Sequence, residues 1–354
     1  MKMYHSLLFL LLLPVFTQCK SPDSQPVPMS DEALMDTVQR STFNYFWDGA
    51  EPNSGLAPER IHMDGVYPED DRNVVTSGGS GFGIMAILAG IDRGYVTRSE
   101  GLARMKKIVS FLETADRFHG VYPHWWYGET GKVKPFGRKD NGGDLVETAF
   151  LMQGLLAVHQ YYINGSSEEQ ALARRIDTLL RDVEWNFYRQ DEQNVLYWHW
   201  SPEYGWEMNF PVHGYNECLI LYILAAASPT HGVPAAVYHE GWAQNGAIVA
   251  PHKVEGIDLH LRYQGCEVSP LFWAHYSFLG LNPTGLKDEY CASYFDEMRN
   301  LALVNRAYCI RNPKNWKGFG PDCWGLTASY SVNGYVAHKP AEQDDLSVIS
   351  PTAA

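Results

Sequence analysis

Apolar side chains recur every three or four residues over most of the chain after residue 30, and acidic or hydroxyl residues precede many of these runs. That spacing gives a helix one apolar face, and a polar residue at the start caps the free backbone N–H groups. Thr97-x-x-Glu100 has the spacing of a capping box, as does Ser167-x-x-Gln170. The pattern predicts helices over residues 30–47, 77–94, 97–120, 143–162, 167–188, 215–227, 234–244, 270–279 and 288–311, with a tenth starting near Trp324.

The connections between these predicted helices alternate between two lengths. Half of them are short, at roughly three to seven residues, and the other half are long, at roughly 25 residues each. Because consecutive packed helices run antiparallel, every long connection falls at one end of the molecule. The pattern predicts an all-α protein whose helix pairs either close into an α/α toroid, with the long loops on one rim, or stack as an open α-solenoid. The repeat of fixed length that an α-solenoid would show is not evident.

Two of the long loops are rich in tryptophan. One reads VYPHWWYGETGKVKPF and the other VLYWHWSPEYGWEMNF, with ETG and PEYG as turn sequences, so both are predicted to be β-hairpins. Aromatic rings on exposed loops need a partner, and sugar rings offer apolar C–H faces beside their hydroxyl groups. These rings either bind a saccharide or pack the loops on each other. They are Trp125, Trp126, Trp198, Trp200 and Trp206.

Acidic residues lie where the loop RKDNGGDLVET meets the helix after it. Asp140 falls in the loop, and Asp144 and Glu147 fall in the first helical turn. Residues three apart share a helix face, so Asp144 and Glu147 are expected to point the same way. Asp144 is also suited to capping the helix, which is the structural alternative to a catalytic role. Asp140 and Asp144 are candidate catalytic groups, and Glu147 is a candidate substrate contact.

A second junction, PVHGYNECLILYIL, places Glu217 at the start of an almost wholly apolar helix. Apolar surroundings disfavour an ionised carboxyl, so we expect a raised pKa for Glu217, as a general acid requires. An ordinary residue of the first helical turn is the alternative. Tyr215 in this junction, with Asp322 and Trp324 in GPDCWGLTAS, are further candidate substrate contacts. Acids that recur on one rim among aromatic residues indicate glycoside hydrolysis by a carboxyl pair.

Composition and missing motifs exclude several other functions. The 354 residues include 41 acidic and 28 basic side chains, a formal charge of −13, whereas a nucleic-acid partner requires a basic surface. No HExxH motif is present and the 13 histidines are scattered, so we expect neither a metal nor another cofactor. The glycine-rich run 78–83 lacks the preceding strand of a nucleotide site, and we predict close helix packing there.

The first 19 residues, MKMYHSLLFLLLLPVFTQC, contain an apolar run that is too short to span a bilayer as a mature helix. They are predicted to be a lipoprotein-type signal, because the run ends at Cys19 and the polar linker of residues 20–29 follows. Residues 30–354 are predicted to form the hydrolase domain. We expect an exported protein of the periplasm or outer membrane that is attached to the membrane only through a lipid on Cys19. Plain secretion is the alternative.

Four longer segments resemble one known family. They read RKDNGGDLVETAFLMQGLL, WEMNFPVHGYNECLILYILAAASPTH, AHYSFLGLNP and GFGPDCWGLTAS, and the resemblance covers nearly all of residues 31–354. The chain is similar to the glycoamylase-like family, which holds glycoside hydrolase family 144, the bacterial endo-β-1,2-glucanases. The resemblance implies an (α/α)6 toroid and endo-hydrolysis of β-1,2-glucan with inversion at the anomeric carbon. Carried over by motif, Asp140, Asp144 and Glu147 match acids of the family's sugar-binding cleft, and Glu217 matches its general acid.

The resemblance also sets expectations for the end of the chain. Family members continue past the stretch that resembles SPTAA, with further helices and another acid implicated in base catalysis. We therefore expect about ten of the twelve toroid helices here, an exposed apolar flank, and reduced or absent activity. The base is then Asp144, Asp140 or that further acid. An exo-acting or α-glucan hydrolase on the same fold, or a non-catalytic surface glycan-binding lipoprotein, are the alternatives. The expected partner is a β-glucan oligosaccharide or polysaccharide.

Overall fold

The protein was studied as a computed structural model, which describes residues 29–263, 265–331 and 334–350. The chain forms two compact units, residues 1–39 and 40–354, and α1 (Asp31–Trp47) runs across the boundary. The predicted signal, Cys19 and nearly all of the predicted linker lie outside the described residues. Among the described helices, none has the length and apolar character that crossing a bilayer requires. The candidate active site lies in the second unit.

Helices dominate the described part of the chain, largely where the apolar spacing predicts them. After α1 the α-helices are α2 (Ser77–Asp92), α3 (Arg98–Leu112), α4 (Leu145–Tyr162), α5 (Ser167–Arg181), α6 (Leu219–Ala227), α7 (Leu271–His275) and α8 (Tyr294–Arg311). The shorter helical segments are the 3-10 turns η1 (Phe187–Arg189), η3 (Gln244–Gly246) and η4 (Tyr276–Leu279) and the π-helix η2 (Val237–Trp242).

Local side-chain hydrogen bonds explain where two helices begin. The capping box at Thr97 opens α3 as predicted, but α5 is capped by Ser166 rather than Ser167, since the Ser166 hydroxyl accepts the N–H of Glu169. α6 begins later than predicted because the Asn216 side chain accepts the N–H of Cys218 at 3.0 Å in a tight turn. Glu217 therefore lies in this turn and not in the helix.

The described residues also contain eleven short strands, so the all-α prediction is too simple. They are β1 (Val74–Thr76), β2 (Trp125–Tyr127), β3 (Val133–Lys134), β4 (Gly143–Asp144), β5 (Leu196–Tyr197), β6 (His199–Trp200), β7 (Pro211–Val212), β8 (Val249–Val254), β9 (Ile257–Leu261), β10 (Ala328–Ser331) and β11 (Gly334–Ala337). All of them pair antiparallel.

The predicted tenth helix near Trp324 is wrong. Residues 321–327 form no helix, and the β10–β11 hairpin follows them, with Ala328 paired with Ala337 and Tyr330 with Tyr335. The described part of the chain therefore holds eight α-helices rather than about ten.

One of the two predicted tryptophan hairpins is confirmed and the other is rearranged. β2 and β3 form the first hairpin, to which β1 adds a third strand. In the second loop β5 pairs with β7, but β6 leaves this hairpin and pairs with β4 instead. The β4–β6 pairing sets Asp144 opposite His199.

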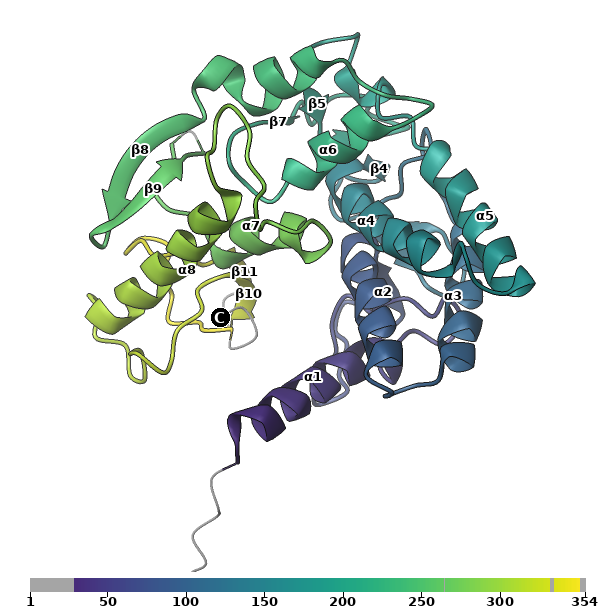
Figure 1. Ribbon diagram of the computed structural model, residues 1–354, viewed down its shortest axis with the longest axis horizontal. Helices are drawn as coiled ribbons and strands as arrows, with labels where there is room; N and C mark the ends of the chain where they lie inside the picture. The colour runs from purple at the N-terminus through teal and green to yellow at the C-terminus, as the bar shows by residue number, and fades with distance from the viewer. Residues whose placement is uncertain (1–28, 264, 332–333, 351–354) are drawn as a thin grey trace, which may run out of the picture. The chain divides into compact units, whose positions relative to one another are not determined.

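Helix α4 lies at the centre of the packing and contacts α2, α5 and α6 (Figure 1). The backbones of α2 and α4 approach so closely that a Cβ atom on Gly81 would collide with the carbonyl of Phe150, and one on Gly154 with the carbonyl of Gly81. This confirms that the glycine-rich run serves close helix packing, but the expectation that no strand precedes the run is wrong, because β1 ends at Thr76 directly before α2. The N-termini of α4 and α6, which follow the acidic junctions, are thus parts of one packed core.

Candidate active site

Asp144 caps the N-terminus of α4 and is completely buried. Its Oδ1 atom accepts the N–H groups of Val146 (3.1 Å) and Glu147 (2.9 Å), and its Oδ2 atom accepts the indole N–H of Trp198 (3.1 Å). Asp144 therefore does cap the helix, which is the structural alternative to a catalytic role. Capping uses only one of its two oxygens, however, and the other faces a cluster of polar side chains.

Two histidines complete the surroundings of the Asp144 carboxylate. His124, which precedes β2, places Nδ1 3.0 Å from Asp144 Oδ2, and His199 on β6 places Nε2 3.3 Å from the same oxygen. Burial opposes ionisation of Asp144, but the positive histidines and their hydrogen bonds outweigh burial and hold the pKa of Asp144 well below its ordinary value. Asp144 is thus ionised at neutral pH.

The same contacts keep both histidines protonated. Burial lowers the pKa of His124, but Glu147 and the hydrogen-bonded Asp144 outweigh it and raise this pKa to about 9. Burial likewise opposes the charge on His199, yet Asp144 and Asp140 raise its pKa to about 10. At neutral pH the cluster therefore holds two cations against its carboxylates.

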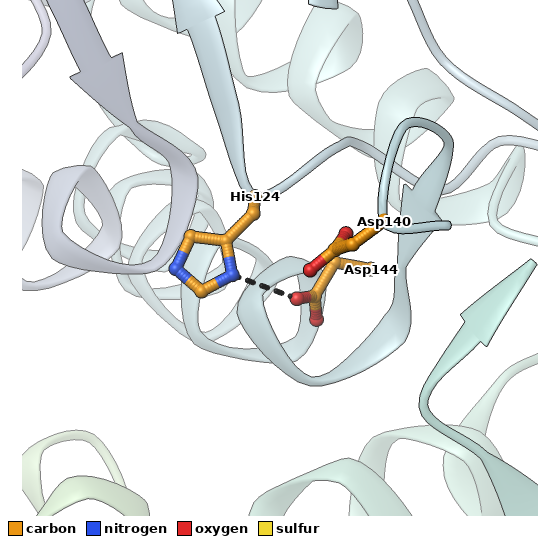
Figure 2. Close-up of side chains that lie close together, drawn as sticks. All are labelled: His124, Asp140 and Asp144. Atoms are coloured by element: carbon orange, nitrogen blue, oxygen red, sulfur yellow. Dashed lines mark hydrogen bonds and ion pairs between the residues drawn. The ribbon is translucent and has the colours of Figure 1, made fainter. Parts of the chain in front are cut away.

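Asp140 lies beside this pair, as Figure 2 shows for the side chains of His124, Asp140 and Asp144. Its Oδ2 atom is 3.0 Å from His199 Nε2. The ligand atoms of the three residues in Figure 2 lie within 4.8 Å of one another, as a metal site would need. Asp144 Oδ2, however, already accepts hydrogen bonds from His124 and Trp198. Because His124 is protonated at neutral pH, its Nδ1 atom donates to Asp144 and has no lone pair to offer a metal ion.

Glu147 lies in the first turn of α4 and reaches toward α2. Its Oε2 atom accepts the N–H of Gly78 at 3.0 Å, and a Cβ atom at Gly78 would collide with this oxygen. Burial raises the pKa of Glu147 to about 7, against the attraction of His124 and with added repulsion from Asp144. A carboxyl group with this pKa exchanges protons readily near neutral pH.

Glu217 lies in the turn before α6 and has the environment predicted for a general acid. It is buried, and its Oε2 atom has no hydrogen-bond partner among the described residues. Burial raises the pKa of Glu217 to about 8, and the negative charges of Glu147 and Asp144 add to the rise. The direction of this shift agrees with the expectation from the sequence, and the repulsion indicates that Glu217 lies near the acids of the α4 junction.

The tryptophans are less exposed than predicted. Trp126 is completely buried and donates its indole N–H to the carbonyl of Asp116 (3.1 Å), so its predicted place on an exposed hairpin is wrong. Trp125 is nearly buried as well, and its N–H reaches Glu59 Oε2 at 3.1 Å. Large apolar rings gain more from covering the core than from solvent exposure.

The tryptophans of the second loop are partly buried. Trp198 donates its indole N–H to Asp144. Trp200 and Trp206 pack around the ring of Phe187, with centroid distances of 5.6 and 5.4 Å. The alternative interpretation, in which the rings pack the loops together, describes these two side chains.

Of three further predicted substrate contacts, one is buried in the core and two lie apart from the acid cluster. Tyr215 is buried, and its hydroxyl has no hydrogen-bond partner in the described part of the chain. Trp324 packs against a small cluster of its own around Tyr308 and Leu326, and Asp322 is an exposed residue beside it. None of the described contacts brings Asp322 or Trp324 to the acid cluster.

The sequence interpretation missed the residues that control the charge of the site. His124 and His199 were dismissed as two of 13 scattered histidines, and partly buried Glu59, whose pKa burial raises, was not considered. His199 stands in the alternating run YWHW, but its partner is set by the β4–β6 pairing between distant segments. Only the adjacency of His124 to the predicted hairpin was visible in advance.

Comparison with known proteins places the chain in a family. Residues 209–354 match the family model described as "Putative glucoamylase". The chain is 82% identical to a solved structure called a putative glucoamylase from Bacteroides caccae, with a TM-score of 0.90, covering 91% of this chain and 78% of that one. It is 64% identical to the endo-β-1,2-glucanase of Chitinophaga pinensis, solved with sophorotriose and glucose, with a TM-score of 0.90 and coverage of 92% and 78%.

A curated relative from Parabacteroides distasonis is described as an exo β-1,2-glucooligosaccharide sophorohydrolase acting at the non-reducing end. It is 43% identical over 357 residues, which cover 95% of this chain and 48% of the relative. The chain thus spans about half the length of this curated relative. High identity over most of the chain, a shared fold and the family-model match agree, and the chain belongs to the glycoamylase-like family of glycoside hydrolases that includes the β-1,2-glucanases.

Proposed function

We propose that the protein hydrolyses β-1,2-linked glucans, with Glu217 as the general acid. The observation that carries this proposal is the contrast between a buried carboxyl with a pKa of about 8, which holds its proton at neutral pH, and the ionised Asp144 near it. A glycosidase needs one carboxyl group in each of these states. The substrate class follows from two relatives, one described as an endo-β-1,2-glucanase and the other as an exo β-1,2-glucooligosaccharide sophorohydrolase.

In the proposed reaction the Glu217 proton passes to the glycosidic oxygen as the bond from that oxygen to the anomeric carbon breaks. A water molecule attacks the anomeric carbon from the opposite face and gives its proton to a carboxylate, so the configuration inverts. Asp144 is poorly suited to accept that proton, because both of its oxygens accept hydrogen bonds and its pKa is lowered. Asp140, whose Oδ2 atom contacts His199 Nε2 and which does not cap the helix, is the better base candidate of the two.

We further propose endo-action on an (α/α)6 toroid. The Chitinophaga relative, described as an endo-enzyme, is 64% identical, whereas the relative described as exo-acting is 43% identical. Exo-action is therefore the second candidate. The site residues discussed above do not distinguish the two, because they act on the scissile bond in either case.

The experiment is to incubate the full-length protein with linear β-1,2-glucan and, separately, with starch, and to follow the size of the products over time. Endo-hydrolysis gives a ladder of oligosaccharides at early times, and exo-hydrolysis releases one short product throughout. New reducing ends from starch alone would overturn the substrate class. Binding of β-1,2-glucan without release of reducing ends would overturn the hydrolase proposal in favour of a glycan-binding protein.

We also propose that the protein is exported and anchored through a lipid on Cys19. The apolar run that ends at Cys19 and the polar linker after it support this. Metabolic labelling with a fatty acid in a bacterial host should label the protein, and Cys19→Ala should abolish the label. An unlabelled unaltered protein recovered in the soluble secreted fraction would favour plain secretion.

A further inference from the structure

The exposed aromatic rings near the acid cluster are not the predicted tryptophans. Phe136 is 51% exposed, Tyr330 on β10 is 46% exposed and Tyr335 on β11 is 56% exposed. Other large side chains of the described residues are exposed to a similar degree, and these three differ in their connections to the residues of the acid cluster.

Phe136 is connected directly to the acid cluster. Its ring stacks on His124, with a centroid distance of 4.4 Å and an interplanar angle of 27°, and lies 4.8 Å from the ring of Trp125. His124 in turn holds Asp144 through the hydrogen bond of 3.0 Å. The open face of Phe136 therefore lies two side chains from a carboxylate of the site.

The two tyrosines face each other across the β10–β11 hairpin and are anchored to the same wall. Their rings are 5.5 Å apart at paired positions of the two strands. The Arg60 guanidinium lies 4.4 Å from the ring centre of Tyr330, and the Tyr330 hydroxyl hydrogen-bonds with Glu59. Glu59 also accepts the indole N–H of Trp125, which joins the hairpin to the wall that carries Phe136.

Tyr335 approaches the site from the side of the general acid. Its pKa is raised to about 12 by burial and by the negative charges of Glu217 and Glu147, so its hydroxyl keeps its proton beside these carboxyls. A protonated phenol next to an open ring face offers both a hydrogen-bond donor and an apolar surface.

We propose that the exposed rings of Phe136, Tyr330 and Tyr335 bind glucosyl units of the substrate by stacking on their C–H faces. The three rings are connected through Glu59 and Trp125, which lie between Tyr330 and Phe136. At one end Tyr335 lies near Glu217, and at the other end Phe136 stacks on His124, the partner of Asp144. Aromatic faces suit the apolar side of a sugar, and the acids next to them would meet the glycosidic oxygens. The ligand in this inference rests on the proposed function.

The test is calorimetric titration of sophorotriose into Glu217→Gln protein, so that the ligand is not consumed. In this background Phe136→Ala and Tyr335→Ala should each weaken binding about tenfold, the loss expected when one ring face no longer covers a sugar. Tyr335→Phe should keep most of the affinity, since it retains the ring. The matched control is Phe295→Ala on α8, whose ring is 41% exposed and which should bind as tightly as the background protein.

Two results would overturn the inference. If Glu217→Gln protein binds sophorotriose and both alanine variants bind it equally well, the rings are not sugar contacts, and the proposed hydrolase function is untouched. If this protein does not bind sophorotriose while the unaltered protein hydrolyses another glucan, both the ligand class and the inference fail. Unchanged circular dichroism of the variants would show that lost affinity does not come from misfolding.

Discussion

The beginnings of α4 and α6 both carry an acidic residue, but the two carboxyl groups are held in opposite states. Asp144 at α4 accepts two backbone N–H groups and an indole N–H and faces two protonated histidines, which keep it ionised. Glu217 at α6 leaves one oxygen without a described partner and is repelled by Glu147 and Asp144, which keeps its proton in place. Both carboxyl groups are buried, and the difference is that Asp144 has positive histidines and hydrogen-bond donors around it, whereas burial of Glu217 is not compensated in this way.

The histidines make this separation possible. Without His124 and His199 the acids of the cluster would repel one another, and the charge on Asp144 would be spread over several partly protonated groups. Two cations beside Asp144 keep it ionised, and its charge adds, after burial and Glu147, to the raised pKa of Glu217. The site therefore holds Asp144 ionised and Glu217 protonated at the same pH.

The largest effect should come from removing the proton donor. Glu217→Gln should lower kcat by about a thousandfold, because the leaving oxygen then departs without protonation. The measurement is the initial rate of reducing-end release from β-1,2-glucan by the full-length protein. Glu203→Gln, which changes an exposed glutamate in the second tryptophan loop, should keep the unaltered rate. A Glu217→Gln variant with the rate of Glu203→Gln would remove Glu217 from the mechanism.

A large loss of stability should follow removal of the ionised acid. Asp144→Asn should lower the free energy of unfolding by about 3 kcal/mol, since it leaves two buried cations without their common partner. Urea denaturation measures this change. Asp296→Asn is the matched control, because it removes an exposed acid from the first turn of α8 and should cost no more than about 0.5 kcal/mol. Equal losses would mean that Asp144 is only a helix cap.

Glu217 should make the protein less stable in alkali. Its folded pKa of about 8 lies above the ordinary 4.5, so the stability that its protonated form contributes is present below pH 4.5 and is lost as the pH rises through 8. Glu217→Gln cannot ionise and should be about 2 kcal/mol more stable than the unaltered protein at about pH 9. Thermal unfolding of both proteins across this range provides the comparison. A difference that does not change with pH would contradict the raised pKa.

The smallest predicted effect is on the free energy of unfolding when His199 is replaced, and it depends on pH. The folded pKa of His199 is raised from 6.5 to about 10, so its contribution to stability is full below pH 6.5 and disappears as the pH rises through 10. Asp144 behaves oppositely, because its lowered pKa gives stability that is lost as the pH falls below 3.8. His199→Asn should lower stability by about 1 kcal/mol at pH 6 and by less at pH 10.5. A constant difference between these two pH values would show that His199 acts by packing alone.

Much of the helical framework could be predicted from the sequence, because apolar spacing and capping residues are local signals. The capping box at Thr97 and the close packing of the glycine-rich run near Gly81 are examples that the structure confirms. The helix predicted to start near Trp324 was wrong because residues 328–331 pair with residues 334–337 as a strand, and strand pairing is not a local signal. Helix ends shifted where a side chain formed a turn, as Asn216 does before α6.

Of the candidate site, only the acidic residues could be predicted from the sequence. Asp144, Glu147 and Glu217 stand at junctions that the sequence shows, and apolar neighbours after Glu217 indicate its raised pKa. His199 was not predictable, because the β4–β6 pairing that brings it to Asp144 joins segments far apart in the chain. The burial of Trp126 was missed for a related reason, since the hairpin was expected to project from the rim and instead joins β1 beside the core.

The most direct test of the account is the protonation state of Glu217 itself. Carboxyl carbon shifts of ¹³C-glutamate-labelled protein can be followed by NMR from about pH 4 to pH 10, with Glu217→Gln used to assign the Glu217 signal. The account predicts a midpoint near pH 8, with the carboxyl group still mostly protonated at neutral pH. A midpoint near the ordinary 4.5 would show that Glu217 is ionised at neutral pH, and it could not then be the proton donor.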